Sequence, residues 1–108
     1  MKVVVALGSN KNQEENIRRA QKCLMEIFPN IVFDAPVWTK PVGIVSDLFL
    51  NCLGRMETMK QEAELITIFK EIERSMGDSH ANHQQGFVWI DIDLIELDGR
   101  RIKNIIWQ

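Results

Sequence analysis

A short stretch near the end of the sequence, Trp89–Ile95, limits the possible folds more than any other part of the chain, because apolar and acidic residues alternate in it. Successive side chains of a β-strand point to opposite faces, so Asp91 and Asp93 share one face and the apolar residues share the other. The stretch predicts a core strand with two carboxylates roughly 6–7 Å apart along the backbone. Two such oxygen ligands can hold Mg²⁺ beside a polyphosphate. The alternative is an ordinary strand with acidic residues on its solvent face.

The length of 108 residues, of which 45% are hydrophobic, predicts one compact domain over residues 1–108. The formal charge of −2 gives no long-range attraction for nucleic acid or an acidic membrane surface, so neither is an expected partner. No apolar run approaches the roughly 18 residues of a membrane span, and the start does not resemble a signal peptide, so we expect a cytoplasmic protein. Cys23 and Cys52 lack the partners of a zinc site, so both are expected to be reduced core thiols.

The first part of the chain predicts a strand followed by a helix. Residues 3–7 form an unbroken apolar run, typical of a strand that is buried on both faces. Asn12, with Glu15 three residues later, predicts a capping box at the start of a helix. Apolar residues then recur at helical spacing until Pro29 ends the helix.

Two further strands are predicted before the second helix. Residues 31–38 predict a strand in which Pro36 indicates an edge or a bulge. Residues 39–47 contain proline and glycine without a sustained period, so they predict a loop. Residues 49–57 alternate in the manner of a strand.

The second half predicts a helix, a loop and two more strands. Thr58 with Gln61 predicts a helix start, an apolar stripe runs to Met76, and Gly77 is the natural residue after the helix end. A polar loop, 78–87, leads into the strand with the two aspartates.

Asp98-Gly99 lies between two alternating stretches, which is a strong hairpin signal, and predicts a last strand over 101–107. The order of elements is therefore β-α-β-β-α-β with an added terminal hairpin. This is the order of a ferredoxin-like α+β sandwich, in which two helices pack on one face of a mainly antiparallel sheet.

The sequence contains three separated motifs: Ala6-Leu7-Gly8-Ser9-Asn10 followed by Glu14-Glu15-Asn16-Ile17, then Pro41-Val42-Gly43 with Phe49-Leu50-Asn51, then Ile90-Asp91-Ile92-Asp93-Leu94. These motifs resemble 6-hydroxymethyl-7,8-dihydropterin pyrophosphokinase, a family of the folate pathway. Together they extend over nearly the whole chain in the order of that family. The family has a ferredoxin-like core, which agrees with the element order.

Members of this family transfer the β,γ-pyrophosphoryl group of ATP to the hydroxymethyl group of the pterin, with two Mg²⁺ ions held by an Asp-x-Asp strand. The resemblance implies that the chain is an ATP-dependent pyrophosphokinase, with ATP and hydroxymethyldihydropterin as its ligands. It also implies that Asp91 and Asp93 are the metal ligands. That role suits phosphoryl chemistry, which depends on positioning and charge neutralisation.

The resemblance also implies a pterin site. Its residues are Gly8, Thr39, Pro41, Val42, Phe49 and Asn51. In the family, the asparagine at the position of Asn51 hydrogen-bonds the pterin ring, an aromatic residue at Phe49 stacks on it, and a loop meets its polar edge. Without the resemblance, Asn51 could satisfy a neighbouring backbone group, Phe49 could be ordinary core and Gly8 a turn residue.

For the nucleotide, the resemblance implies Ile66 and Lys70 on the second helix, with His80 in the following loop. His80 and His83 can also be interpreted as a metal- or phosphate-binding pair, or as solvated loop residues without a ligand.

The chain departs from the family in two places. Arginines that steer the pyrophosphoryl group in the family are replaced by Asp78 and Val88, so no catalytic residue is assigned, and residues 78–88 contain no arginine or lysine. Family members also continue beyond the position of Trp107 with a segment that contacts ATP and the pterin, whereas this sequence lacks that extension. The nearby basic residues, Arg100, Arg101 and Lys103, form either a compensating cluster or a solvated surface.

Alternatives therefore remain open. The chain is an active pyrophosphokinase, a catalytically silent relative that binds a pterin or nucleotide, or an interaction domain that forms homo-oligomers through the apolar tail Ile105-Ile106-Trp107. The retained Asp91, Asp93 and Asn51 favour the first hypothesis over the third. The loss of every cation from the loop favours the second over the first.

Overall fold

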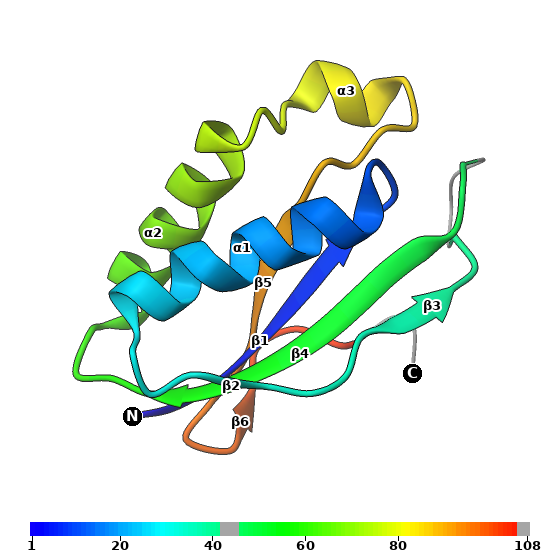
Figure 1. Cartoon of the computed structure of the whole chain (residues 1–108). Helices are drawn as coiled ribbons and strands as arrows, with labels where there is room; N and C mark the ends of the chain where they lie inside the picture. The colour runs from blue at the N-terminus through cyan, green and yellow to red at the C-terminus, as the bar shows by residue number, and fades with distance from the viewer. Residues whose placement is uncertain (42–45, 106–108) are drawn as a thin grey trace.

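A computed structural model describes residues 1–41 and 46–105, and its helices and strands are labelled in Figure 1. In chain order they are β1 (Lys2–Ser9), α1 (Gln13–Ile27), β2 (Val32–Phe33), β3 (Val37–Thr39), β4 (Phe49–Glu57), α2 (Glu62–Ser75), α3 (His80–Gln84), β5 (Asp91–Leu97) and β6 (Arg100–Arg101). The strands form one antiparallel sheet in the order β2-β4-β1-β5-β6, and β3 also pairs with β4. This α+β architecture is compatible with the predicted ferredoxin-like fold.

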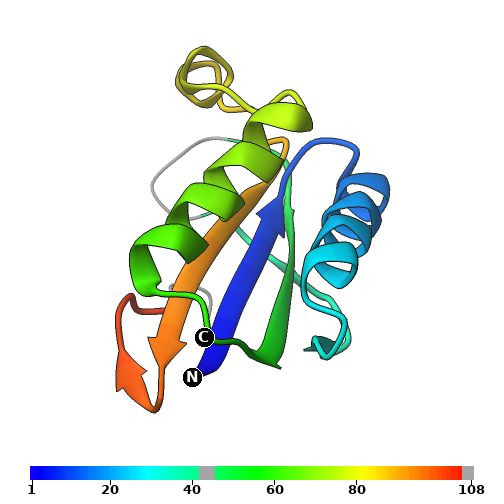
Figure 2. The same cartoon turned by 90° about the vertical axis from the view of Figure 1, so that its left-hand side faces the viewer.

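Helices α1 and α2 bury their apolar stripes in one core together with the central strand β1 (Figure 2). Val3, Val5 and Leu7 point into this core, because alternate residues of a strand share a face. Phe28, next to the end of α1, meets Phe69 of α2 edge to face, with ring centroids 6.5 Å apart. The prediction of a buried first strand and two amphipathic helices is confirmed.

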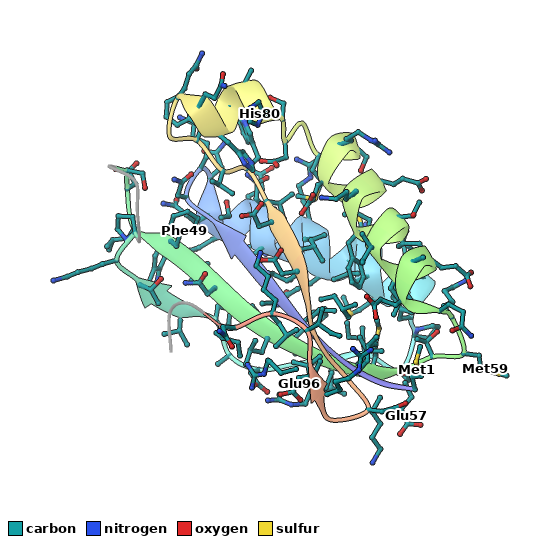
Figure 3. All side chains as sticks on the ribbon, turned by 180° about the vertical axis from the view of Figure 1, so that it is seen from behind. Met1, Phe49, Glu57, Met59, His80 and Glu96 are labelled. Atoms are coloured by element: carbon teal, nitrogen blue, oxygen red, sulfur yellow. The ribbon has the colours of Figure 1, made fainter. Side chains whose placement is uncertain are left out.

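The opposite face of the sheet carries a smaller buried cluster of Ala6, Leu53 and Ile95, against which Ile105 packs. Figure 3 shows this face, with the chain after β6 crossing over the strands. Ile105 is thus partly buried within the chain, while Ile106 and Trp107, the rest of the predicted oligomerisation tail, lie outside the described residues.

Several predicted elements are confirmed in detail. Strand β4 has the predicted bounds, and Gly77 follows α2 with a φ of 90°. Asp98 and Gly99 have φ angles of 49° and 82°, so both adopt the left-handed conformation of a type I′ hairpin turn. Cys23 and Cys52 are free thiols, Cys52 fully buried and Cys23 half-buried.

The predicted capping contacts were wrong, although Asn12 directly precedes the first helix as expected. Asn12 precedes α1 but has a φ of 46°, and its side chain accepts no capping hydrogen bond. The second helix begins after Gln61, whose N–H donates to the Glu64 carboxylate at 3.2 Å, rather than at Thr58. The Thr58 hydroxyl instead accepts the nearby N–H of Lys60 in a local turn.

Other boundaries also differ from the prediction. The expected strand 31–38 is divided into β2 and β3 around Pro36, which has no N–H for the ladder. The expected loop 78–87 contains the short helix α3. Among the described residues the last strand is limited to β6 and is not continued over 102–105, because the N–H groups of Ile102 and Lys103 both turn to the carbonyl of Ile95. Positions 106 and 107 of the predicted strand lie outside the described residues.

Within the described part of the chain, no helix has the length and apolar character needed to cross a membrane.

Candidate functional site

Asp91 and Asp93 lie on the face of the sheet opposite α1 and α2. In the ladder between β1 and β5, Asp91 is opposite Gly8 and Asp93 is opposite Ala6, while Ile92 between them points into the helix-covered core. Their side chains are 42% and 37% exposed. The predicted alternation is therefore confirmed, and both carboxylates are accessible from solvent.

A small cavity of about 120 Å³ joins the two aspartates to residues from the other central strands. It is lined by Ala6, Leu7, Gly8, Asn51, Asp91, Asp93, Ile95, Lys103, Asn104 and Ile105. Gly8 and Asn51, both predicted to bind the pterin, thus share one cavity with the predicted metal ligands. The sheet brings them together because Gly8 on β1 pairs with Asn51 on one side and with Asp91 on the other.

Asn51 is 4% exposed, and its Nδ2 donates to the Thr39 hydroxyl at 2.5 Å. A methyl group added at Gly8 would lie 3.1 Å from Asn51 Oδ1 and 3.8 Å from the Phe49 ring. Gly8 therefore leaves room beneath Asn51 and Phe49 that a side chain would fill. Four of the predicted pterin residues meet at this point of the sheet.

The other two predicted pterin residues are Pro41 and Val42. Pro41 is half-buried and does not line the cavity. Val42 lies outside the described residues.

The residues predicted to bind the nucleotide border Asp93 from the other side. Ile66 and Lys70 of α2 line a hollow of about 270 Å³ together with Asp93 and Lys103. His80 lines a neighbouring hollow of the same volume, which Lys70 also borders. The structure therefore places the three predicted nucleotide residues along one continuous side of the aspartate strand.

Carboxylates are crowded at this site, and two of them have raised pKa values. Burial, followed by repulsion from Asp93, raises the pKa of Asp91 from 3.8 to about 6. Burial raises the pKa of Glu73 from 4.5 to about 7, with repulsion from Asp91 adding to the effect. Glu73 also accepts the N–H of Ile92 at 2.7 Å, so this carboxylate lies directly behind the aspartate strand.

The two residues that replace the family's arginines have structural contacts. Asp78, whose side chain is 6% exposed, accepts the N–H groups of Trp89 at 2.9 Å and Ile90 at 3.4 Å through Oδ1. These bonds explain why β5 begins at Asp91 rather than at Trp89. Val88 is 6% exposed, and its N–H donates to Asn10 Oδ1 at 2.6 Å.

Glu73 was not among the predicted site residues, and Lys103 was predicted only as part of a basic cluster with Arg100 and Arg101. Lys103 Nζ lies 3.1 Å from Asp93 Oδ1, whereas Arg100 and Arg101 pair with other acids near the hairpin. The three basic residues are thus divided between two sites. The helical spacing of Lys70 and Glu73 could have indicated that both border the same groove, but no sequence signal specifies the turn that sends Lys103 to Asp93.

A hollow of about 620 Å³, larger than those described above, lies at the other end of the sheet, where its lining includes Lys2, Glu57 and Glu96. We call this the hairpin end, and the end with Gly8, Phe49 and Asp91 the carboxylate end. Figure 3 shows Glu57 and Glu96 at one end and Phe49 and His80 at the other. None of the predicted site residues lines the larger hollow, so its size does not identify the functional site.

Comparison with protein-family models gives a match to the family described as 7,8-dihydro-6-hydroxymethylpterin-pyrophosphokinase, over residues 4–106. The matched range contains every predicted site residue and confirms the resemblance drawn from the three motifs. No curated protein matched the chain.

Proposed function

Because the chain belongs to the 7,8-dihydro-6-hydroxymethylpterin-pyrophosphokinase family, we propose that it transfers pyrophosphate from ATP to 6-hydroxymethyl-7,8-dihydropterin. In this reaction the hydroxymethyl oxygen bonds to the β-phosphorus of ATP, the bond from that phosphorus to the α-phosphate oxygen breaks, and AMP leaves. The hydroxymethyl group loses its proton in the same exchange.

One observation carries the proposal: the pterin residues Gly8 and Asn51 and the carboxylates of Asp91 and Asp93 line the same cavity. A pyrophosphoryl transfer needs the acceptor alcohol beside the metal-bound phosphates, and this arrangement supports that proximity. Effective positioning of this kind contributes much of the rate enhancement in two-substrate reactions.

The pterin would bind over Gly8. Asn51 has its Nδ2 bound to Thr39, which fixes the plane of the amide and leaves Oδ1 facing the space above Gly8. An amide held in this way can accept a hydrogen bond from the pterin without losing further side-chain freedom on binding. Phe49, at the edge of the same space, would stack on the ring.

The donor set at Asp91 and Asp93 suits Mg²⁺, since both are half-exposed carboxylates that share a face. Mg²⁺ held there would neutralise phosphate charge and orient ATP. Lys70 and Lys103, which line the hollow beside Asp93, would add positive charge to the phosphates on the side facing α2.

The experiment measures AMP released from Mg-ATP by the purified chain, with and without 6-hydroxymethyl-7,8-dihydropterin. We expect pterin-dependent AMP that is lost, by about 10³-fold or more, in the Asp91→Asn/Asp93→Asn double variant. Glu96→Gln is the matched control, because Glu96 is an acid on the same strand that pairs with Arg101 at the hairpin end.

A well-folded wild type that releases no AMP above the double variant would overturn the proposed activity and identify a catalytically silent relative. Equal AMP release by the double variant and by Glu96→Gln would reject the assignment of the two aspartates.

A further inference from the structure

Three potential metal-binding side chains converge beside the aspartate strand, each from a different segment. Asp78 follows α2, His83 belongs to α3, and Asp91 begins β5. One ligand atom of each lies within 4.8 Å of the other two. His83 Nε2 is 2.7 Å from Asp78 Oδ2 and 4.0 Å from Asp91 Oδ1, so a single imidazole nitrogen faces both carboxylates.

Contacts outside the cluster hold these side chains in place. Asp78 is nearly fully buried, and its Oδ1 accepts the N–H of Trp89, which leaves Oδ2 directed at His83. The segment that carries His83 is fixed by Ser79, whose hydroxyl accepts the N–H of Asn82 at 3.1 Å. Asp91 is held by the ladder with Gly8. A ligand at this point therefore meets one carboxylate fixed by hydrogen bonds to the backbone and two side chains carried by ordered backbone segments.

We infer that Asp78, His83 and Asp91 bind a divalent transition-metal ion of the Zn²⁺ or Co²⁺ class. An imidazole nitrogen with carboxylate oxygens suits these ions, whereas Mg²⁺ prefers oxygen ligands alone. Three protein ligands leave further coordination positions open to water or an external anion, as in catalytic zinc sites. The ion takes the place of the proton in the hydrogen bond between His83 Nε2 and Asp78 Oδ2.

This site is separate from the Mg²⁺ site of the proposed function, although it shares Asp91. It uses the nitrogen of His83 and excludes Asp93, whose Oδ1 contacts Lys103. An ion there would bring positive charge to the segment 78–88, which contains no arginine or lysine. Any effect on pyrophosphoryl transfer rests on the proposed function, but binding of the ion does not.

The test is equilibrium binding of metal alone to the metal-free chain, without nucleotide or pterin. Zn²⁺ is titrated by calorimetry and Co²⁺ by visible absorption, at a mildly alkaline pH, because metal ligands bind in their deprotonated forms. We expect one saturable ion, and His83→Gln should weaken its binding at least about tenfold, since even the loss of a supporting contact to a metal ligand costs about that much. His80→Gln is the matched control, because His80 lies in the same helix, outside the cluster, next to Gln84.

Asp91→Asn gives a second removal of a ligand and should weaken Zn²⁺ as His83→Gln does, whereas Asp93→Asn should not. Zn²⁺ should also raise the melting temperature of the wild type and of His80→Gln more than that of His83→Gln. The inference is overturned if the wild type shows no saturable binding. It is equally overturned if His83→Gln and Asp91→Asn bind Zn²⁺ as the wild type does, which would assign the ion to other groups such as Cys23.

Discussion

The two ends of the sheet differ in how far their acidic side chains are paired with basic ones. At the hairpin end, acids pair with arginines. The pairs are Asp34 with Arg55 at 2.7 Å, Glu96 with Arg101 at 2.9 Å and Glu62 with Arg100 at 3.4 Å. All of these groups lie on the surface, where such pairs stabilise a fold by about 1 kcal/mol or less.

At the carboxylate end, acids outnumber their cationic partners among the described residues. Glu73, Asp78, Asp91 and Asp93 are close together there. Lys103 contacts Asp93. His83, which is charged only when protonated, contacts Asp78 and Asp91.

This difference in charge pairing indicates which end of the sheet would gain stability from a bound cation. At the hairpin end, these six charged side chains are paired with one another within the chain. The carboxylate end keeps groups that repel one another, an arrangement that costs stability and is typical of sites that bind cations. Burial and repulsion therefore point to the same end of the sheet as the site residues predicted from the sequence.

The largest expected effect on stability comes from removing the buried carboxylate that organises the carboxylate end. Asp78→Ala leaves the N–H groups of Trp89 and Ile90 without their acceptor. Hydrogen bonds to a charged group contribute about 1.5–3 kcal/mol each, so we expect the free energy of unfolding to fall by about 3 kcal/mol in urea denaturation.

Asp78→Asn keeps an oxygen for the same N–H groups and should lose about half as much. A loss below about 0.5 kcal/mol in Asp78→Ala, as expected for a surface residue, would contradict a structural role for Asp78. The two ends of the sheet would then not differ in how much their acidic residues contribute to stability.

The acidic groups at the carboxylate end predict an unusual dependence of stability on pH. In the folded chain the pKa of Asp91 is about 6 and that of Glu73 about 7, above their ordinary values of 3.8 and 4.5. The folded state therefore holds more protons than the unfolded state between these values. Their contribution to stability is full below about pH 4 and is lost as the pH rises through about 6 to 7.

We expect the free energy of unfolding of the metal-free chain to fall by on the order of 1 kcal/mol between pH 5 and pH 8, since solvent screens these half-exposed groups. Urea denaturation with a chelator present measures it. Glu73→Gln should flatten the profile, whereas Glu62→Gln at the hairpin end should leave it unchanged. A profile that rises over this range in the wild type would show that the carboxylates are not under repulsion.

Much of the helix-covered core followed from the sequence because it depends on local periodicity. The apolar run of 3–7 and the alternation of 49–57 correspond directly to β1 and β4, and the turn at Asp98-Gly99 has the predicted left-handed angles. The shared face of Asp91 and Asp93 followed from the same rule.

The missed features depend on partners far apart in the sequence. Asn12 has the right chemistry for a helix cap, but its left-handed backbone prevents that contact. The start of β5 is set by Asp78, eleven residues before Trp89, and the position of Lys103 depends on the carbonyl of Ile95. Such contacts depend on tertiary geometry, which periodicity and residue type do not encode.

A smaller effect is expected where Lys103 contacts Asp93. Lys103→Met should raise the affinity of the chain for Mg²⁺ about threefold, because the ion no longer has to displace the ammonium from Asp93 Oδ1 and exposed pairs contribute less than about 1 kcal/mol. Calorimetry with Mg²⁺ alone measures this change. Arg101→Met, which breaks a pair at the hairpin end, should leave Mg²⁺ binding unchanged, and weaker binding by Lys103→Met would mean that Lys103 assists the ion.

The smallest effect belongs to the hairpin end. Arg55 and Asp34 are about half-exposed, with side-chain exposures of 54% and 50%, so solvent screens their attraction despite the 2.7 Å contact. We expect Arg55→Ala to lower the free energy of unfolding by about 0.5 kcal/mol, and high salt to reduce that difference. The two ends differ in burial as well as in charge, and Arg55 is exposed. A loss above about 2 kcal/mol in Arg55→Ala would therefore have to come from the ion pair itself and not from burial. The carboxylates without a cationic partner would then lower the free energy of unfolding by more than their burial alone does. A bound cation would contribute correspondingly more to stability.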